Sequence, residues 1–357
     1  MRVVVMGAGG YVGSRLVPAL LAAGHEVTAT FTDATTAGRF WWAGQADVVE
    51  MDVRERASVR AATDGASALY YLVHGLGGVD FATSDRQGAY NAAHAAVRAG
   101  VERIIYLGGL VPDIADTDLS PHLRSRLEVE EVLTDSGVPT LALRAAMVIG
   151  SGSTSFEIMR QMSERMPVQV LPTWMDSQVE PVAVTDVITA LVGALTAPLL
   201  SRAFDVGSGE RMAYAALLRL YADRAGLRRV QVSVPGLPTA LVSRLAPILT
   251  QAPAATVQTL VESLRHDMIC GRQDFMVQLM PRRHVLTPVA EALDRALALP
   301  DETVPDSQRD VIGPLTSDVP WAGGQVSRRN GMPVHRGDGW RGLLLGPAPD
   351  PGAPAAL

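Results

Sequence analysis

The sequence holds a single cysteine, Cys270, and the lack of a second one excludes a disulfide framework. Because Cys270 lies in an apolar stretch, we expect a buried, unreactive thiol. No apolar run is suited to a membrane span: the longest, residues 182–200, is interrupted by Asp186 and Pro198 and predicts a packed core helix. Stripes of basic residues are also lacking, and the formal net charge of −6 argues against a nucleic-acid partner.

Several catalytic signatures are missing as well. There is no His/Cys/Asp cluster with metal-ligand spacing, no Gly-x-Ser-x-Gly elbow and no Walker lysine, so metal, hydrolase and kinase chemistry receive little support. Residues 2–6 fit a strand better than a signal peptide. These absences, with the lone thiol, predict a soluble cytoplasmic protein that contacts neither membrane nor nucleic acid.

The first thirteen residues, MRVVVMGAGGYVG, carry the strongest positive signal. An apolar strand leads into Gly7, Gly10 and Gly13, and a helical pattern follows. Gly7 would allow the tight turn, Gly10 the close approach of a pyrophosphate and Gly13 close helix–strand packing. The helix that begins at Tyr11 and Val12 would direct its positive N-terminal end at the phosphates. This motif predicts a dinucleotide site, and a purely structural glycine turn is the alternative.

Strand and helix patterns alternate over the first 145 residues. Such β–α–β repetition predicts an α/β Rossmann fold, a doubly wound parallel sheet, within residues 1–150. Helix-ending glycines keep phase with it, at Gly24, Gly65, Gly100 and Gly137. The expected strands are 2–6, 26–31, 47–50, 68–73, 103–107 and 140–144, and the expected helices are 11–23, 34–42, 54–63, 80–99 and 119–136.

The pattern is looser after residue 145. We expect a smaller α/β substrate lobe over residues 151–299, interleaved with the core, and an extended tail over residues 300–357 that docks through Trp321 and is disordered after Gly346. Trp174, Gln178 and Glu180, on a loop of the lobe, are candidates for facing a substrate. The expected lobe helices are 151–165, 185–196, 214–225 and 239–246, and the expected strands are 168–171, 203–206 and 230–234.

Weaker signals indicate whether the cofactor is NAD or NADP, which carries a phosphate at the 2′-position of its ribose. After the second strand, Thr32 and Asp33 follow the position at which an acidic residue would bind the ribose of NAD, so Asp33 comes one or two residues late. Asp33 could turn back to the ribose, or it could cap the next helix. The nearest cation, Arg39, lies inside that helix, so the sequence favours NAD over NADP. After the third strand, Asp52 and Val53 could meet the adenine, or form a plain turn.

Longer segments resemble a known family. They include YYLVHGL (70–76), YLGGL (106–110), LSPHLRSRLEVE (119–130) and DVPWAGG (318–324). With these, the chain resembles the atypical short-chain dehydrogenase/reductase superfamily, in its NAD(P)H-binding, nitrogen-metabolite-repressor-like branch and a bacterial subgroup of it. The resemblance implies a Rossmann core, NAD or NADP as cofactor and cofactor contacts from Leu72, Val73, His74 and Leu107.

The chain departs from that superfamily at the proton-transfer residues. Gly108 and Gly109 stand where a Ser or Thr is usual, and His122-Leu-Arg-Ser-Arg126 replaces Tyr-x-x-x-Lys. His122 could act as general acid or base, with its pKa lowered by Arg126, while Arg126 could bind the nicotinamide ribose. The alternative is a solvated pair at a helix N-terminus, with Ser120 as the cap.

The sequence therefore predicts an NAD(P)-dependent oxidoreductase or epimerase-like enzyme acting on a small molecule, as a monomer or homodimer. In it, His122 or a bound water handles the proton. A non-catalytic dinucleotide sensor is the main alternative, because the Ser-Tyr-Lys set is missing. A structural subunit that keeps a nucleotide for stability is a third, weaker possibility.

Overall fold

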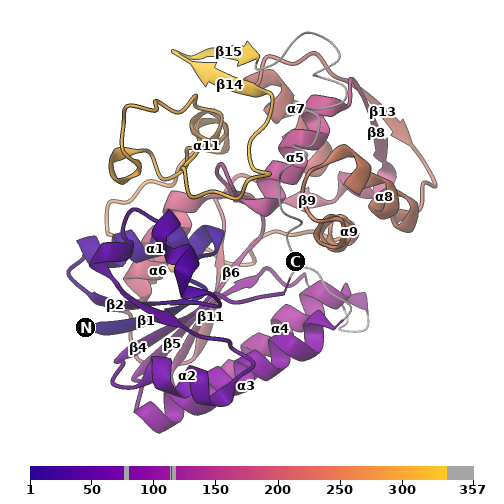
Figure 1. Ribbon diagram of the computed structural model, residues 1–357. Coiled ribbons are helices and arrows are strands. Elements are labelled where there is room, and N and C mark those ends of the chain that lie inside the picture. The colour runs from indigo at the N-terminus through magenta and orange to yellow at the C-terminus, as the bar shows by residue number, and fades with distance from the viewer. Residues whose placement is uncertain (76–79, 113, 115–117, 336–357) are drawn as a thin grey trace.

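A seven-stranded parallel sheet forms the centre of the computed structural model, which describes residues 1–75, 80–112, 114 and 118–335 (Figure 1). The strand order is β11-β6-β5-β4-β1-β2-β3, and every neighbouring pair runs parallel. The order reverses beside β1, which is where an open α/β sheet forms its ligand crevice. The strands are β1 (Arg2–Met6), β2 (Glu26–Phe31), β3 (Asp47–Glu50), β4 (Ala68–Tyr71), β5 (Arg103–Gly109), β6 (Thr140–Ala145) and β11 (Arg202–Val206).

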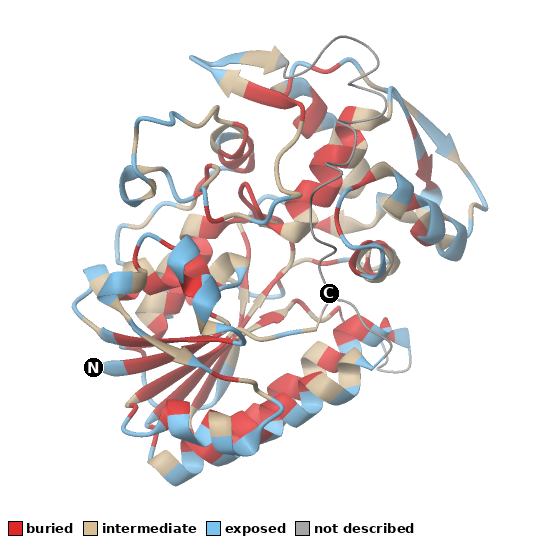
Figure 2. Ribbon diagram, viewed as in Figure 1, coloured by how far each residue is buried: buried red, intermediate tan, exposed pale blue. Residues whose placement is uncertain are grey.

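Helices cover both faces of this sheet, and the side-chain alternation of the strands explains how. In β1, Val3 and Val5 pack into one apolar cluster while Val4 and Met6 pack into another. Because both faces are covered, the central strands are almost entirely buried (Figure 2). On one face lie α1 (Tyr11–Ala22) and α6 (Val184–Ala194), and on the other α2 (Arg56–Thr63), α3 (Phe81–Ala99) and α4 (Pro121–Thr134).

Several predictions for the core are confirmed and two are corrected. Gly24, Gly65, Gly100 and Gly137 all have positive φ at the expected turns. The helix expected at residues 34–42 is instead two 3₁₀ segments, Ala34–Arg39 and Ala43–Gln45, because glycines weaken this short stretch. The strand expected at 68–73 ends at Tyr71, which leaves Leu72 and Val73 in the following loop.

A second layer of structure lies over the carboxyl ends of the sheet strands (Figure 1). The strand expected near 203–206 does not stay in this lobe: as β11 it pairs with β6 and completes the central sheet. The lobe contains α5 (Thr154–Arg165), β8 (Val168–Pro172), a 3₁₀ turn (Thr173–Asp176), α7 (Tyr214–Arg224), β13 (Val230–Val234), α8 (Thr239–Leu245), a 3₁₀ turn (Ala246–Leu249), α9 (Ala254–Ser263), α10 (Phe275–Gln278) and α11 (Val289–Ala296). The two-residue strands are β7 (Val148–Ile149), β9 (Gln178–Val179), β10 (Val182–Ala183) and β12 (Met212–Ala213).

The segment after residue 300 is more ordered than expected. A 3₁₀ turn (Asp306–Gln308) is followed by a hairpin of β14 (Val326–Arg329) and β15 (Met332–His335), whose Asn330-Gly331 turn has positive φ at both residues. Trp321 packs against an apolar cluster of the lobe, as anticipated. The expected disorder after Gly346 lies outside the described residues.

A buried ion pair fastens this C-terminal segment to the glycine-turn helix. Arg15 of α1 is 2% exposed and lies 2.9 Å from a carboxylate oxygen of Asp318. The same guanidinium donates to the carbonyl oxygens of Ser151 and Val311, each at 2.9 Å. One side chain therefore joins the Rossmann helix, the lobe and the C-terminal segment. None of the helices in the described ranges combines the length and the apolar character that crossing a bilayer requires.

Candidate functional site

The glycine turn after β1 has the backbone geometry of an anion cradle. Gly7 has φ +87°, and a Cβ at Gly13 would lie only 2.2 Å from the Gly7 carbonyl oxygen, so both positions require glycine. Gly10 precedes α1 without a side-chain cap, and the first turn of α1 has no acidic residue. Its N-terminal amides are therefore available to an anionic ligand. The turn fits the diphosphate of a dinucleotide.

A cavity of about 600 Å³ extends from this turn to the lobe. Ten residues that the sequence assigned to the site line it: Gly7, Gly10, Tyr11, Val12, Gly13, Leu72, His74, Leu107, His122 and Arg126. These residues come from the glycine turn after β1, from α1, β5 and α4, and from the loop after β4. The fold thus brings the glycine turn and the two candidate catalytic residues to one cavity.

The N-terminal turn of α4 carries the catalytic candidates, with the capping that the sequence predicts. Ser120 caps the helix by accepting from the Leu123 amide at 3.3 Å, and Pro121 occupies the first helical position. The alternative of a solvated pair is wrong for His122, since this residue is only 7% exposed. The reason is long-range packing: α9 lies over this turn, and Ser263 of α9 hydrogen-bonds Ser120 at 3.1 Å between hydroxyls.

Burial fixes the protonation of His122. Desolvation, followed by the charge of Arg126, lowers the pKa of His122 from 6.5 to about 3. The imidazole is therefore neutral at pH 7 and can donate one N–H or accept one hydrogen bond, but it holds no proton to release as an acid. Arg126 is the only fully charged residue among the described residues of the cavity wall.

Arg126 has a side-chain donor that no other protein group satisfies among the described residues. Its Nε is buried and has no hydrogen-bond partner within the described ranges. The Tyr106 hydroxyl donates to the backbone carbonyl of Arg126 at 3.1 Å, which holds this turn of α4 against the sheet. A buried, partnerless N–H on a cavity-lining guanidinium is what a bound anionic or carbonyl oxygen would satisfy. The residues present thus fit both the diphosphate and the ribose–nicotinamide end of the cofactor.

His74 is positioned by the loop after β4. Asp85 of α3 accepts from the Gly75 amide at 2.7 Å and from the Ser125 hydroxyl at 3.2 Å, and so links this loop to α4. Desolvation, then Arg126 and His122, lower the pKa of His74, although part of this side chain is exposed to solvent. His74 shares the cavity with His122.

The end of β5 explains why the superfamily Ser is absent. A Cβ at Gly108 would lie 2.8 Å from the Tyr106 ring, so a serine there would displace this buried side chain. Gly109 has more room, its nearest neighbour being a Leu123 methyl at 3.8 Å from an added Cβ. All 31 basic residues of the chain are arginines, so no lysine can fill the Tyr-x-x-x-Lys role.

Five other predicted cofactor residues do not line the cavity. Asp33 accepts from the Thr35 amide at 2.9 Å and caps the 3₁₀ segment, which is the alternative left open above. Asp52 accepts from the amide and the guanidinium of Arg54 in a local turn. The remaining three, outside the wall as well, are Thr32, Val53 and Val73.

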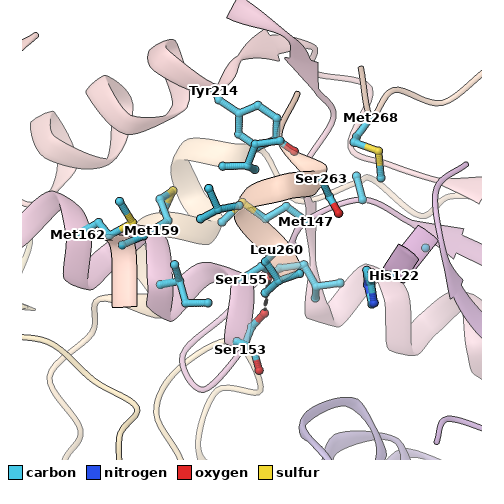
Figure 3. Close-up of a pocket in the computed structure, with 18 of the residues that line it drawn as sticks. His122, Met147, Ser153, Ser155, Met159, Met162, Tyr214, Leu260, Ser263 and Met268 are labelled. Atoms are coloured by element: carbon cyan, nitrogen blue, oxygen red, sulfur yellow. Dashed lines mark hydrogen bonds between the residues drawn. The ribbon is translucent and has the colours of Figure 1, made fainter. Parts of the chain in front are cut away.

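The lobe half of the cavity was largely missed by sequence reasoning. Of the three candidates on its loop, Trp174 lines the cavity, whereas Gln178 and Glu180 do not. The other side chains come from distant segments, and Figure 3 shows Met159 and Met162 at the end away from His122. Its lining includes Met147, Ile158, Met159, Met162, Met166, Leu171, Tyr214, Leu217, Val242, Leu245, Leu260 and Met268.

Comparison with known proteins places these features in context. The sequence model of a family described as NAD(P)H-binding matches residues 7–192, just over half of the chain. Uncharacterised proteins of Mycobacterium bovis and Mycobacterium tuberculosis are 29% identical over 150 residues, which are 42% of this chain and 15% of theirs. The chain thus spans a small part of the curated relatives it matches.

Solved structures share the fold. A Citrobacter sp. triphenylmethane reductase superposes with TM-score 0.67 at 19% identity, covering 83% of this chain and 99% of that one. An NADPH-dependent quinone oxidoreductase of Escherichia coli, complexed with NADPH, gives 0.64 at 17% identity, covering 82% and 98%. A Staphylococcus aureus nucleoside-diphosphate-sugar epimerase gives 0.65 at 14% identity, covering 82% and 99%.

Proposed function

We propose, given that the chain belongs to the NAD(P)H-binding family, that it is an NAD(P)-dependent oxidoreductase that reduces a carbonyl group of a small molecule. The observation that carries this proposal is the single cavity shared by the glycine turn and by His122 and Arg126 of α4. A nucleotide diphosphate at the turn would leave its nicotinamide end directed along this cavity, toward α4.

Arg126 and His122 would bind the substrate oxygen. When bound, the reduced nicotinamide supplies a hydride to the carbonyl carbon and is itself oxidised. The C–O π electron pair moves onto the oxygen, where the Arg126 cation stabilises the negative charge and the neutral His122 donates a hydrogen bond. That oxygen then takes a proton from a solvent water, which leaves as hydroxide.

Water, rather than His122, is the proton source in this proposal. With a pKa of about 3, fewer than roughly one His122 in a thousand is protonated at pH 7. A neutral imidazole nevertheless polarises a carbonyl effectively when it is fixed in place. The role proposed for His122 is therefore that of a hydrogen-bond donor.

Steady-state turnover with NADH or NADPH and a panel of carbonyl and quinone acceptors tests this function. We expect Arg126→Met to lower kcat/KM about 100-fold or more, because it removes the only full charge at the oxygen. The matched control is Arg124→Met, an exposed arginine of the same helix that does not line the cavity. Full turnover by Arg126→Met would contradict the assignment.

A non-catalytic dinucleotide sensor is the second candidate, and the lack of lysine together with the steric block at Gly108 favours it. Nucleotide binding at micromolar concentrations without turnover of any acceptor would support the sensor over the enzyme.

We also propose the choice between NAD and NADP, the location of the protein and its oligomeric state. Arg39 is the cation nearest the expected ribose position, and its guanidinium donates a hydrogen bond to the Ser317 carbonyl at 3.1 Å. Because this arginine is engaged by the protein rather than left for a 2′-phosphate, we propose NAD rather than NADP. The single cysteine supports a cytoplasmic location, and the long helices α3 and α4 would form the contact of a homodimer if the protein is not a monomer.

A further inference from the structure

We infer that the lobe half of the cavity binds an uncharged, largely apolar substrate whose reducible group lies at the α4 end. This inference rests on the proposed function and names its substrate class. A sugar nucleotide or any other phosphorylated compound is excluded as substrate on the same grounds.

The walls of the lobe half supply the first argument. They are formed by aliphatic and thioether side chains of α5, α7, α8 and α9, together with β8. Methionines, represented by Met159 and Met162 of α5 and Met268, are flexible and fill irregular apolar space (Figure 3). Apolar surface of this kind contributes affinity in proportion to the apolar area that it removes from water.

The distribution of charge supplies the second argument. Within the described part of the chain, no carboxylate lines the cavity and Arg126 is its one permanent cation. Arg126 belongs to α4, on the side of the cavity assigned to the cofactor in the proposed function, so the lobe half offers no cation to a phosphate. A diphosphate buried there would have no cation to compensate its charge.

Three polar side chains of the lobe half are satisfied by the protein itself. The Ser263 hydroxyl donates to the Thr259 carbonyl at 3.2 Å, and the Trp174 Nε1 donates to the Leu237 carbonyl at 3.0 Å. Gln169 donates from Nε2 to the Ser163 hydroxyl at 3.1 Å. The hydroxyl groups of Thr154, Ser155 and Tyr214 also line the cavity, and they are fewer than the hydroxyl groups that a sugar nucleotide presents.

Helix α8 lies at the edge of the cavity and offers a matched pair of positions for the test. Leu245 lines the cavity yet is 51% exposed, so it stands at the edge of the cavity. Leu241, one turn earlier, is 46% exposed and does not line the cavity. Both positions are open enough to accept a charged side chain without unfolding the protein.

The test is a fluorescence titration of the full chain with N-phenyl-1-naphthylamine, an uncharged probe of apolar sites. We expect saturable binding that decan-2-one displaces and UDP-glucose does not. Leu245→Glu should weaken probe binding at least tenfold, whereas Leu241→Glu should leave it within twofold of the unsubstituted protein. Absence of saturable binding, displacement by UDP-glucose, or equal effects of the two substitutions would overturn the inference.

Turnover separates this inference from the proposed function. With the reduced cofactor, kcat/KM for 2-alkanones should rise about fourfold per added methylene from butanone to octan-2-one, the gain expected for burial of each group. A flat series would contradict the apolar site. No turnover of any acceptor, with the binding results intact, would refute the oxidoreductase while leaving the apolar ligand class supported.

Discussion

Replacement of Gly10 separates cofactor binding from folding. Gly10 has φ −75° and ψ 170°, a conformation open to any residue, and an added Cβ would approach only the Gly7 carbonyl oxygen, at 3.3 Å. We therefore expect Gly10→Ala to fold normally. Its methyl group would, however, stand where the dinucleotide diphosphate approaches the backbone.

The size of the effect follows from the contacts that a displaced diphosphate would lose. A charge-assisted hydrogen bond to a backbone amide contributes about 1.5–3 kcal/mol, so the loss of one raises Kd roughly 10- to 100-fold. Fluorescence titrations with NADH or NADPH at fixed salt measure Kd, and thermal unfolding without nucleotide measures the melting temperature, which reports whether the variant is folded and stable. Gly10→Val should weaken binding further, at the same melting temperature.

Gly13 gives the contrasting control. Its added Cβ would lie 2.2 Å from the Gly7 carbonyl oxygen and 2.9 Å from the Ala8 Cα, so Gly13→Ala must shift the backbone itself. We expect this variant to lose both affinity and stability. Unchanged nucleotide affinity in Gly10→Val, with the melting temperature also unchanged, would refute a diphosphate site at this turn.

Two further predictions concern buried charge. Asp318→Asn would leave the Arg15 guanidinium buried without its counter-ion. We expect urea unfolding to show a free energy of unfolding about 3 kcal/mol lower than that of the unsubstituted protein. A loss below about 1 kcal/mol would show that the ion pair does not fasten the C-terminal segment. The lowered pKa of His122 means that only the unfolded chain takes up this proton below about pH 6.5. Between pH 7 and pH 5 the free energy of unfolding should therefore fall by about 2 kcal/mol more in the unsubstituted protein than in His122→Asn. Equal pH dependence in the two proteins would contradict a buried neutral imidazole.

Local sequence signals predicted the Rossmann half well because its determinants are local. The glycine turn at Gly7 and the helix-ending glycines act through backbone conformation, which does not depend on distant residues. The Asn330-Gly331 turn is an equally local signal, and it would have identified the C-terminal hairpin. It was overlooked because the surrounding segment has no periodicity.

The properties of the site depend on long-range packing, which explains what the sequence did not reveal. His122 and Arg126 on a helix N-terminus are typical of a solvated surface, and nothing nearby in the sequence indicates that α9, well over a hundred residues later, covers them. The methionines of the cavity are likewise drawn from separate helices. An apolar residue at helical spacing predicts burial, but whether it faces a core or a cavity is decided by its partners.

Burial of His122 and the apolar character of the cavity are two consequences of the same exclusion of water. In this low-dielectric space the imidazole of His122 loses its proton, and Arg126 is the one arginine among the described residues that line the cavity with it. The same low dielectric strengthens the attraction between this one cation and a developing oxyanion. A Tyr-Lys pair uses the lysine charge to make a phenol acidic, whereas here a single arginine in an apolar site would stabilise the oxyanion directly. Such a site gains from an apolar substrate, which excludes from the oxygen all but the water that protonates it, and would lose part of this stabilisation with a hydrated, charged one.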